Sequence, residues 1–232
     1  MAISPRLLLL AVMLIAAVPC VALAGDIQGQ RPVMFVSDTF QFVPGAWTSY
    51  YVHDKGKNEC YIMHMATLEK LKQDGKQCSW MEIEMLPESG PSVATRMLVE
   101  ETKQGPGDLL EVIVQVKGHS PFTVPRKYFE GENKEVGEFR TTQIAKRIAR
   151  RTLELSGRSI TAWEVEATDE KGNKTEALVS EQVLPIGVIM AETPQASMYL
   201  KDWGLNAKSK IIGTPMNFYL WLMMEIGAGL TQ

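Results

Sequence analysis

Hydrophobic and polar residues alternate with a period of two along much of the chain. In the clearest example, Trp163, Val165 and Ala167 are separated by Glu164 and Glu166. Such alternation is typical of a β-strand that has one buried face and one face in water. The pattern predicts strands over residues 47–54, 60–65, 78–86, 93–100, 110–116, 160–168, 175–181, 188–193 and 197–203.

Turn-forming residues separate these predicted strands at the spacing of hairpins. The sequence has Gly56 and Asn58 after the first strand, Gly90-Pro91 after the third and a Gly-Pro-Gly run at 105–107. Strands that are joined by such short connections pair in antiparallel. We therefore expect a mainly β protein that is built on an antiparallel sheet.

Two segments depart from this alternation. Residues 66–74 consist mostly of good helix formers and poor strand formers, which favours a loop or a helical turn there. Ile144 and Ile148 have the i,i+4 spacing of one helix face, which predicts a short helix over residues 138–149. Such a helix would lie across the open face of a curved sheet.

The N-terminus has the order of an export signal. Arg6 precedes an apolar run over residues 7–18, and Pro19 and a small-residue cleavage site at 22–24 follow. Cys20 would suit a lipoprotein, but Pro19 stands where the lipidation signal needs a small residue. We expect a cleaved signal peptide at residues 1–24, a β domain at 25–204, an apolar C-terminal tail at 205–232 that could be helical, and a periplasmic location.

Two cysteines remain after the signal peptide, Cys60 and Cys78. An even number of cysteines in an oxidising compartment suggests a disulfide bond. This bond requires a hairpin centred near Glu69, so that residues 66–74 form the connection. The alternative is a tight turn at Asp74-Gly75, which would put the two sulfur atoms many residues out of register.

Composition and motifs argue against several classes of function. The formal net charge of -3 makes the chain a poor electrostatic partner for nucleic acid. The sequence contains no His-Glu-x-x-His, Cys-x-x-Cys, Gly-x-Ser-x-Gly or phosphate-binding glycine motif. Its three histidines, His53, His64 and His119, fall in separate strands or loops. We expect no enzymatic activity, no metal and no cofactor.

Methionine gives the clearest candidate for a binding surface. Five methionines fall in three consecutive predicted strands, and Ile83 and Val99 share their alternation. Methionine is flexible and polarizable, so a sheet face lined with it can adapt to an apolar guest such as an acyl chain. The alternative is that these residues fill an irregular core. The predicted lining residues are Met63, Met65, Met81, Ile83, Met85, Met97 and Val99, although for the first two the opposite alternation, with Cys60, Ile62 and His64 inward, remains open.

Two further groups could contact a membrane or a partner. The basic residues Lys146, Arg147, Arg150 and Arg151 could bind anionic lipid head groups, or they could be a solvated face that balances the acidic segment 130–138. The tail carries many large apolar residues, among them Phe218, Trp221 and Met224. These could contact a membrane surface or an envelope protein, or they could pack on the tail's own domain.

Several of these features together resemble a known family. They are the Pro44-Gly-x-Trp47 start of the first strand, the long early strands, and the late block from Glu181 to Glu192 that leads to residues 198–204. The combination resembles bacterial periplasmic proteins of the Lol-type lipoprotein carrier superfamily. The resemblance implies a strongly curved antiparallel sheet, an open half-barrel with one or a few short helices across its face, and an apolar cavity for acyl chains. The cysteine pair and the apolar tail that contains Trp221 have no counterpart in that pattern.

Two functions follow as expectations. One is an exported periplasmic protein that binds, and could carry, a lipid or the acyl chains of a lipoprotein, so that its partners are a lipid or an acylated protein. The other is a non-enzymatic envelope module that docks through its apolar C-terminal tail.

Overall fold

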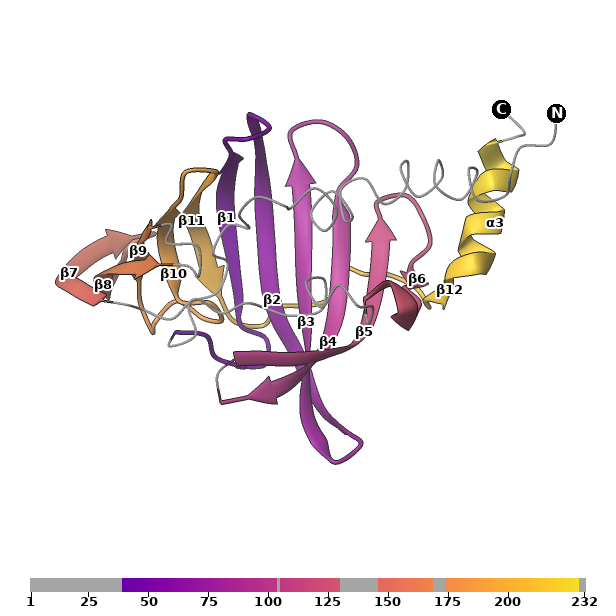
Figure 1. Cartoon of the computed structure of the whole chain (residues 1–232), viewed down its shortest axis with the longest axis horizontal. Helices are drawn as coiled ribbons and strands as arrows, with labels where there is room; N and C mark the ends of the chain where they lie inside the picture. The colour runs from indigo at the N-terminus through magenta and orange to yellow at the C-terminus, as the bar shows by residue number, and fades with distance from the viewer. Residues whose placement is uncertain (1–38, 104, 130–145, 169–173, 230–232) are drawn as a thin grey trace. The chain divides into compact units, whose positions relative to one another are not determined.

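The computed structural model describes residues 39–103, 105–129, 146–168 and 174–229, and these residues form one twelve-stranded sheet (Figure 1). The strand order is β12-β6-β5-β4-β3-β2-β1-β11-β10-β9-β8-β7, and the two outer strands do not meet. All pairs are antiparallel except β12 with β6. The predicted class, an open curved antiparallel sheet, is confirmed.

The strands differ widely in length. Their bounds are β1 Trp47–Asp54, β2 Glu59–Gln73, β3 Lys76–Pro87, β4 Val93–Thr102, β5 Gly105–Val116, β6 Phe122–Thr123, β7 Lys146–Leu155, β8 Arg158–Thr168, β9 Lys174–Val179, β10 Val188–Glu192, β11 Ala196–Gly204 and β12 Met216–Asn217. A short 3-10 helix, η1, spans Arg126–Tyr128, and the helix α3 spans Phe218–Gly229. The predicted signal peptide, 1–24, lies outside the described residues.

The prediction of a loop or helical turn at residues 66–74 is wrong. Strand β2 continues to Gln73, and the chain reverses at Asp74 and Gly75, which both have positive φ angles of 51° and 78°. A bulge between Thr67 and Lys70 is the only trace of irregularity in the pairing of β2 with β3. Differences in helix propensity are only about a few tenths of a kcal/mol per residue. The cross-strand hydrogen bonds of this long hairpin outweigh them.

The predicted helix at residues 138–149 is also wrong where the structure describes it. Residues 146–149 belong to β7, which pairs with β8, while residues 138–145 lie outside the described part of the chain. A bulge between Arg147 and Ala149 places Ile148 as the extra residue of the strand. The i,i+4 spacing of two isoleucines does not distinguish a helix from a strand, because residues four apart also share one face of a strand.

The corner between β9 and β10 depends on Gly187. Its φ angle is +79°, and a Cβ atom at this position would collide with the Thr39 side chain. The Thr39 hydroxyl donates a hydrogen bond of 2.7 Å to the Ile186 carbonyl. Glycine is therefore needed here both for the backbone angle and for the close approach of the N-terminal segment.

Residues 205–215, which we call the strap, connect β11 to β12. In Figure 1 the strap passes behind the strands β2 to β5. The buried Glu82 carboxylate accepts hydrogen bonds from the Ser209 hydroxyl, at 2.5 Å, and from the Lys210 amide, at 2.6 Å. Ile211 is buried against Ala94 and Ile113, with Trp80 beside them. The strap therefore covers one face of the sheet and brings the chain to β6.

Candidate functional site

The strand register brings the predicted lining residues onto one face of the sheet. Met63 lies opposite Met85, Met65 opposite Ile83, and Met81 opposite Met97. Val99 follows on the same side of β4. We call this set of seven residues, Met63, Met65, Met81, Ile83, Met85, Met97 and Val99, the methionine face. Cys60, Ile62 and His64 point to the other side of β2, so the alternation that was open for Met63 and Met65 is decided.

Burial is not uniform across the methionine face. Met65, Met81 and Val99 have exposed fractions of at most 1%, and Met63 and Met97 are also buried. Ile83 and Met85, nearer the end of β3, are half-buried. The face is therefore deepest over the middle of β2 to β4 and more accessible towards the Met85 end.

The apolar face continues beyond the residues that were predicted. Across β1 the register leads from Met63 to Tyr50, and from there the pairs of β11, β10, β9 and β8 carry it on. The buried residues that extend it on these strands are Val52, Met198, Ala191, Ala177 and Val165. Their signal was the period-two alternation in the flanking strands, where small and branched residues stand in place of methionine.

Tyr50 adds a polar group to this face. Its side chain is fully buried, and its hydroxyl donates a 2.8 Å hydrogen bond to the Val188 carbonyl. Burial raises the pKa of the Tyr50 phenol far above its ordinary value, and the neighbouring Thr48 hydroxyl offsets a small part of this shift. The phenol is therefore neutral at physiological pH, and it leaves the face uncharged. Tyr50 was not among the residues predicted from the sequence.

The predicted disulfide is wrong. Cys78 pairs with Leu71 near one end of the β2–β3 hairpin, whereas Cys60 lies at the far end of β2, opposite His53 of β1. The 11 residues from Cys60 to Leu71 correspond to about 35 Å of extended strand, several times the Cα separation of a disulfide. Both cysteines are free, Cys60 exposed and Cys78 buried. The turn at Asp74-Gly75, the alternative considered from the sequence, is the one that forms.

The predicted basic residues lie on β7, an outer strand of the sheet, and are exposed. Arg147 and Arg150 lie over the Trp163 ring, with 5.2 Å and 5.8 Å from guanidinium carbon to ring centroid, and Arg151 forms a 2.5 Å ion pair with Glu164. These contacts favour the solvated-face alternative. Charges on an outer strand also hinder unwanted pairing with other chains.

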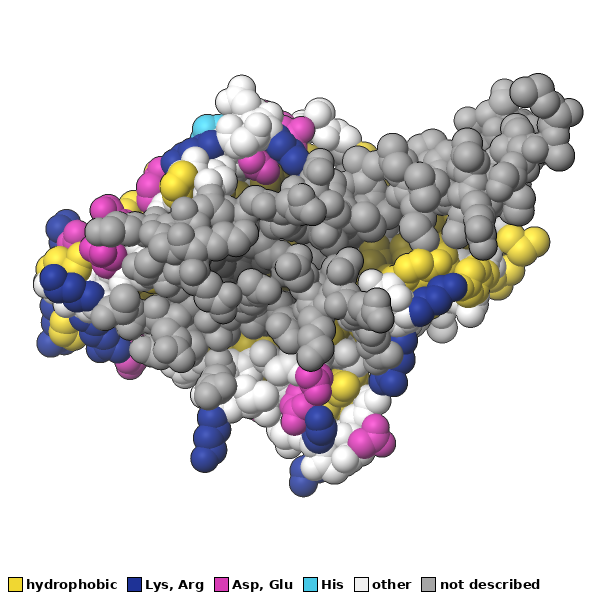
Figure 2. Space-filling view, in the orientation of Figure 1, with side chains coloured by type: hydrophobic (Ala, Val, Ile, Leu, Met, Phe, Trp, Pro, Cys, Tyr) yellow, Lys and Arg dark blue, Asp and Glu magenta, His cyan; other side chains and the backbone are white. Residues whose placement is uncertain are grey.

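The tail residues divide between the domain and the solvent. Trp221 is buried against Phe122, with 4.3 Å between ring centroids, and Phe218 is half-buried against Phe122 and Tyr128. Met224, on the other side of α3, is 53% exposed. Figure 2 shows hydrophobic side chains gathered where α3 lies. No helix among the described residues is long and apolar enough to span a membrane.

The histidines do not come together. His53 lies on β1, His64 on β2, and His119 follows β5. His119 is an exposed residue whose Nδ1 lies 2.9 Å from the Glu225 carboxylate of α3, a contact that joins the helix to the β5–β6 turn. Within the described ranges, no group of three or more His, Cys, Asp or Glu side chains is placed to hold a metal ion.

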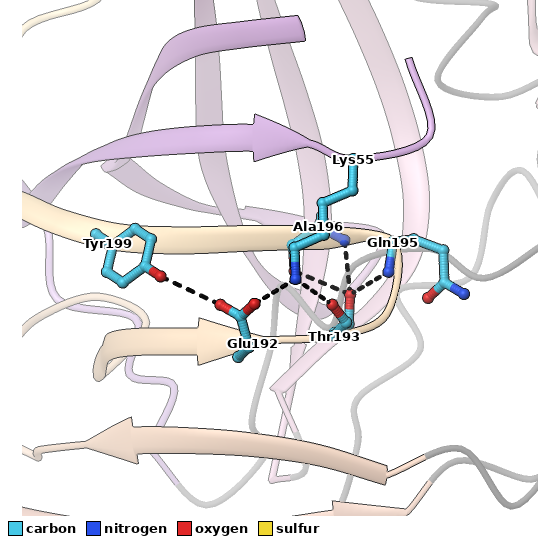
Figure 3. A network of polar contacts seen from close by, with 6 residues as sticks. All are labelled: Lys55, Glu192, Thr193, Gln195, Ala196 and Tyr199. Atoms are coloured by element: carbon cyan, nitrogen blue, oxygen red, sulfur yellow. Dashed lines mark hydrogen bonds and ion pairs between the residues drawn. The ribbon is translucent and has the colours of Figure 1, made fainter. Parts of the chain in front are cut away.

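A polar network at one end of the sheet is structural (Figure 3). Lys55, in the β1–β2 turn, forms an ion pair with Glu192 and donates a 2.9 Å hydrogen bond to the Thr193 carbonyl. The Thr193 hydroxyl and Ala196 close the β10–β11 turn, and Tyr199 donates to Glu192 at 3.2 Å. The network fastens two hairpin turns to each other.

Comparison with known proteins gives remote likenesses. No family model matches the chain, and no curated protein does. Similar solved structures include a candidate lipoprotein from Parabacteroides distasonis (TM-score 0.37, 11% identity, 76% of this chain and 100% of that one). A second is a candidate exported protein with a YmcC-like fold from Bacteroides fragilis (TM-score 0.34, 7% identity, 75% of this chain and 100% of that one). A third is MucB of Pseudomonas aeruginosa in complex with MucA (TM-score 0.34, 9% identity, 73% of this chain and 55% of that one).

Likenesses at this level carry no argument about function. None of these three proteins is named as a Lol-type carrier, so membership of that superfamily stays a prediction. The function of this chain is therefore inferred from its own residues.

Proposed function

We propose that the protein is exported to the bacterial periplasm and there binds an acyl chain, of a lipid or of an acylated protein, on the methionine face. The observation that carries the proposal is the continuity of this face. Residues that are far apart in the sequence meet in register on β2, β3 and β4, and the apolar surface continues as far as β8. No charged side chain stands among the seven residues of the face.

The chemistry of the side chains supports an acyl guest. Burial of each methylene group contributes about 0.8 kcal/mol, so a long acyl chain needs no charged anchor to bind. Methionine side chains have several rotatable bonds and can repack around chains of different length. A core that serves packing alone is better specified by Leu, Ile and Val, whose rotamers are more restricted. The half-buried Ile83 and Met85 give the guest a place to enter.

Native mass spectrometry of the full protein, purified from a bacterial periplasm, tests the proposal. We expect a mass excess that denaturing extraction resolves into phospholipid or fatty acid. Met85→Trp should fill the accessible end of the face and reduce the bound fraction several-fold. Ile148→Trp, on β7, places the same side chain at an exposed position and should leave the bound fraction unchanged.

A bare polypeptide mass from the wild-type protein would overturn the proposal. Equal lipid occupancy in the wild-type protein and Met85→Trp would remove the methionine face as the binding surface. If Met85→Trp does not fold, Ile83→Phe is a smaller change at the other half-buried position, and circular dichroism reports whether either variant is folded.

The second candidate function, docking through the tail, is favoured by one observation. Tyr219, Leu220, Met223 and Met224 leave large apolar surfaces in water on α3. Removal of the whole tail would not test this function, because the strap and Trp221 are parts of the domain. Substitutions confined to the exposed side of α3 are the appropriate test.

A further inference from the structure

Helix α3 has two sides of different character. Trp221 and Phe218 hold one side against Phe122 of β6. The other side presents apolar residues at positions i, i+1, i+4 and i+5, which lie together on a helix surface. Their exposed fractions are 43% for Tyr219, 53% for Leu220, 72% for Met223 and 53% for Met224. We call these four residues the outer side of α3.

The outer side of α3 is a single patch of considerable size. Four such residues leave on the order of 400 Å² of apolar surface in water, which is as large as the largest patch on a typical monomeric protein. Patches of this size usually mark a contact with another molecule. Isolated exposed residues such as Ile148 need no such explanation.

The helix has little charge to oppose burial in an apolar phase. Glu225 is the only charged residue of α3, and its carboxylate is already bonded to His119. The helix therefore presents the apolar outer side without an unpaired acidic group beside it.

Cationic and aromatic groups form the rim of the patch. The Lys127 ammonium group lies 5.0 Å from the Tyr128 ring centroid and 5.3 Å from that of Tyr219. The hydrogen bond with Tyr219 raises the pKa of Lys127, so this group stays charged. Tyrosine rings and basic groups at the border of an apolar surface suit the headgroup level of a membrane.

We propose that the outer side of α3, with Lys127 at its rim, is a contact for the surface of an anionic lipid membrane. The apolar side chains enter the boundary between headgroups and acyl chains, and the Lys127 ammonium group meets lipid phosphates. The helix lies on the membrane and does not cross it, which agrees with its 12 residues. This contact assigns a partner to the second candidate function, and it uses a surface separate from the methionine face.

Site-specific fluorescence on vesicles tests the contact. The full chain carries Cys20→Ser and Cys60→Ser, which leave the buried Cys78 as its native thiol, and Met223→Cys, which accepts an NBD label. With vesicles of phosphatidylethanolamine and about 30 mol% phosphatidylglycerol, whose negative surface attracts basic residues, we expect a blue shift and a several-fold rise in NBD emission. Ile148→Cys in the same background is the matched control, and its label should report water throughout.

Flotation with the same vesicles measures the two contributions separately. Leu220→Ser/Met223→Ser/Met224→Ser should reduce partitioning at least tenfold, since each buried methylene contributes about a fourfold factor. Lys127→Ala should reduce it by about fivefold on anionic vesicles at low salt and hardly at all on neutral phosphatidylcholine. Ile148→Ser should change neither.

Three outcomes would overturn the contact. The first is an NBD emission at residue 223 that does not respond to anionic vesicles. The second is flotation that the triple substitution leaves intact. The third is emission that is already shifted without vesicles and depends on protein concentration, which would assign the outer side of α3 to a second copy of the chain. Native mass spectrometry of bound lipid tests the methionine face independently, so either proposal can fail without the other.

Discussion

The bond between Glu82 and the strap yields the sharpest test of how the C-terminal segment is held. Glu82 is 3% exposed, and its carboxylate accepts from both the Ser209 hydroxyl and the Lys210 amide. Glu82→Ala removes both acceptors and leaves these two donors without their partner. Hydrogen bonds to a charged group contribute about 1.5–3 kcal/mol each, while the relief from burying a charge offsets part of the loss. We expect a net destabilisation of about 2–4 kcal/mol.

The assay is urea unfolding combined with hydrogen exchange at the Lys210 amide. Glu82→Ala should lower the free energy of unfolding and speed exchange at this amide. Glu84→Ala is the matched control, because Glu84 lies two residues further along the same side of β3 and is half-buried. Its expected effect is within about 0.5 kcal/mol, as at most surface positions. Equal effects of the two substitutions, or unchanged exchange at Lys210, would refute the reasoning.

Three further predictions concern other parts of the domain. Met81→Ala should lower the free energy of unfolding of the lipid-free protein by about 2–5 kcal/mol, measured in urea, because Met81 is 1% exposed. Met224→Ala, at an exposed position, should lower it by less than about 0.5 kcal/mol. A loss below about 1 kcal/mol for Met81→Ala would mean that the methionine face is loosely packed. Burial lowers the pKa of His64; the Glu84 charge opposes this shift, and the charges of Lys210 and Lys201 add to it. The neutral His64 side chain therefore contributes stability that is complete above pH 6.5 and is lost as the pH falls towards the pKa of the folded state. Unfolding at pH 7.5 and 5 should therefore show a larger acid loss for wild type than for His64→Gln, and equal losses would exclude this role. In the chain from which residues 1–24 have been removed, Cys60 should react with a maleimide in the native protein. Cys78, whose thiol pKa is raised by burial, should react only after unfolding. Two native labels, or an intact mass two hydrogens light, would contradict this prediction.

Alternation in the sequence was sufficient to predict the sheet and the methionine face. Met81, Ile83 and Met85 could be assigned to one side of β3 because the period of two needs no knowledge of the neighbouring strands. The pattern could not show that the same surface continues through Tyr50 and Val165. That continuity depends on which strands are neighbours, and the pairing of β1 with β11 joins segments about 150 residues apart in the sequence.

The failures have identifiable physical causes. The expected disulfide was used to centre the β2–β3 hairpin near Glu69, so one error in pairing produced the other. Helix propensity at residues 66–73 is a weak preference that cross-strand pairing overrides. At residues 138–149 the helix was inferred from two isoleucines four residues apart, a spacing that also places both on one face of a strand. The contact of Trp221 with Phe122 could not be foreseen, because an apolar tail gives no indication of which surface it will cover.

Strand β3 connects the two proposals and also keeps their tests separate. Its successive side chains point to opposite faces, so Met81 and Ile83 line the methionine face while Glu82 between them holds the strap. The strap leads directly to α3, and its anchorage to β3 therefore fixes where the outer side of α3 lies relative to the sheet. A substitution at Glu82 should weaken vesicle binding through a loosened strap and leave bound lipid in place, whereas a substitution at Met85 should do the reverse. If each substitution changed both properties, the two faces of β3 would be coupled, and acyl binding and membrane contact would be parts of one transfer event.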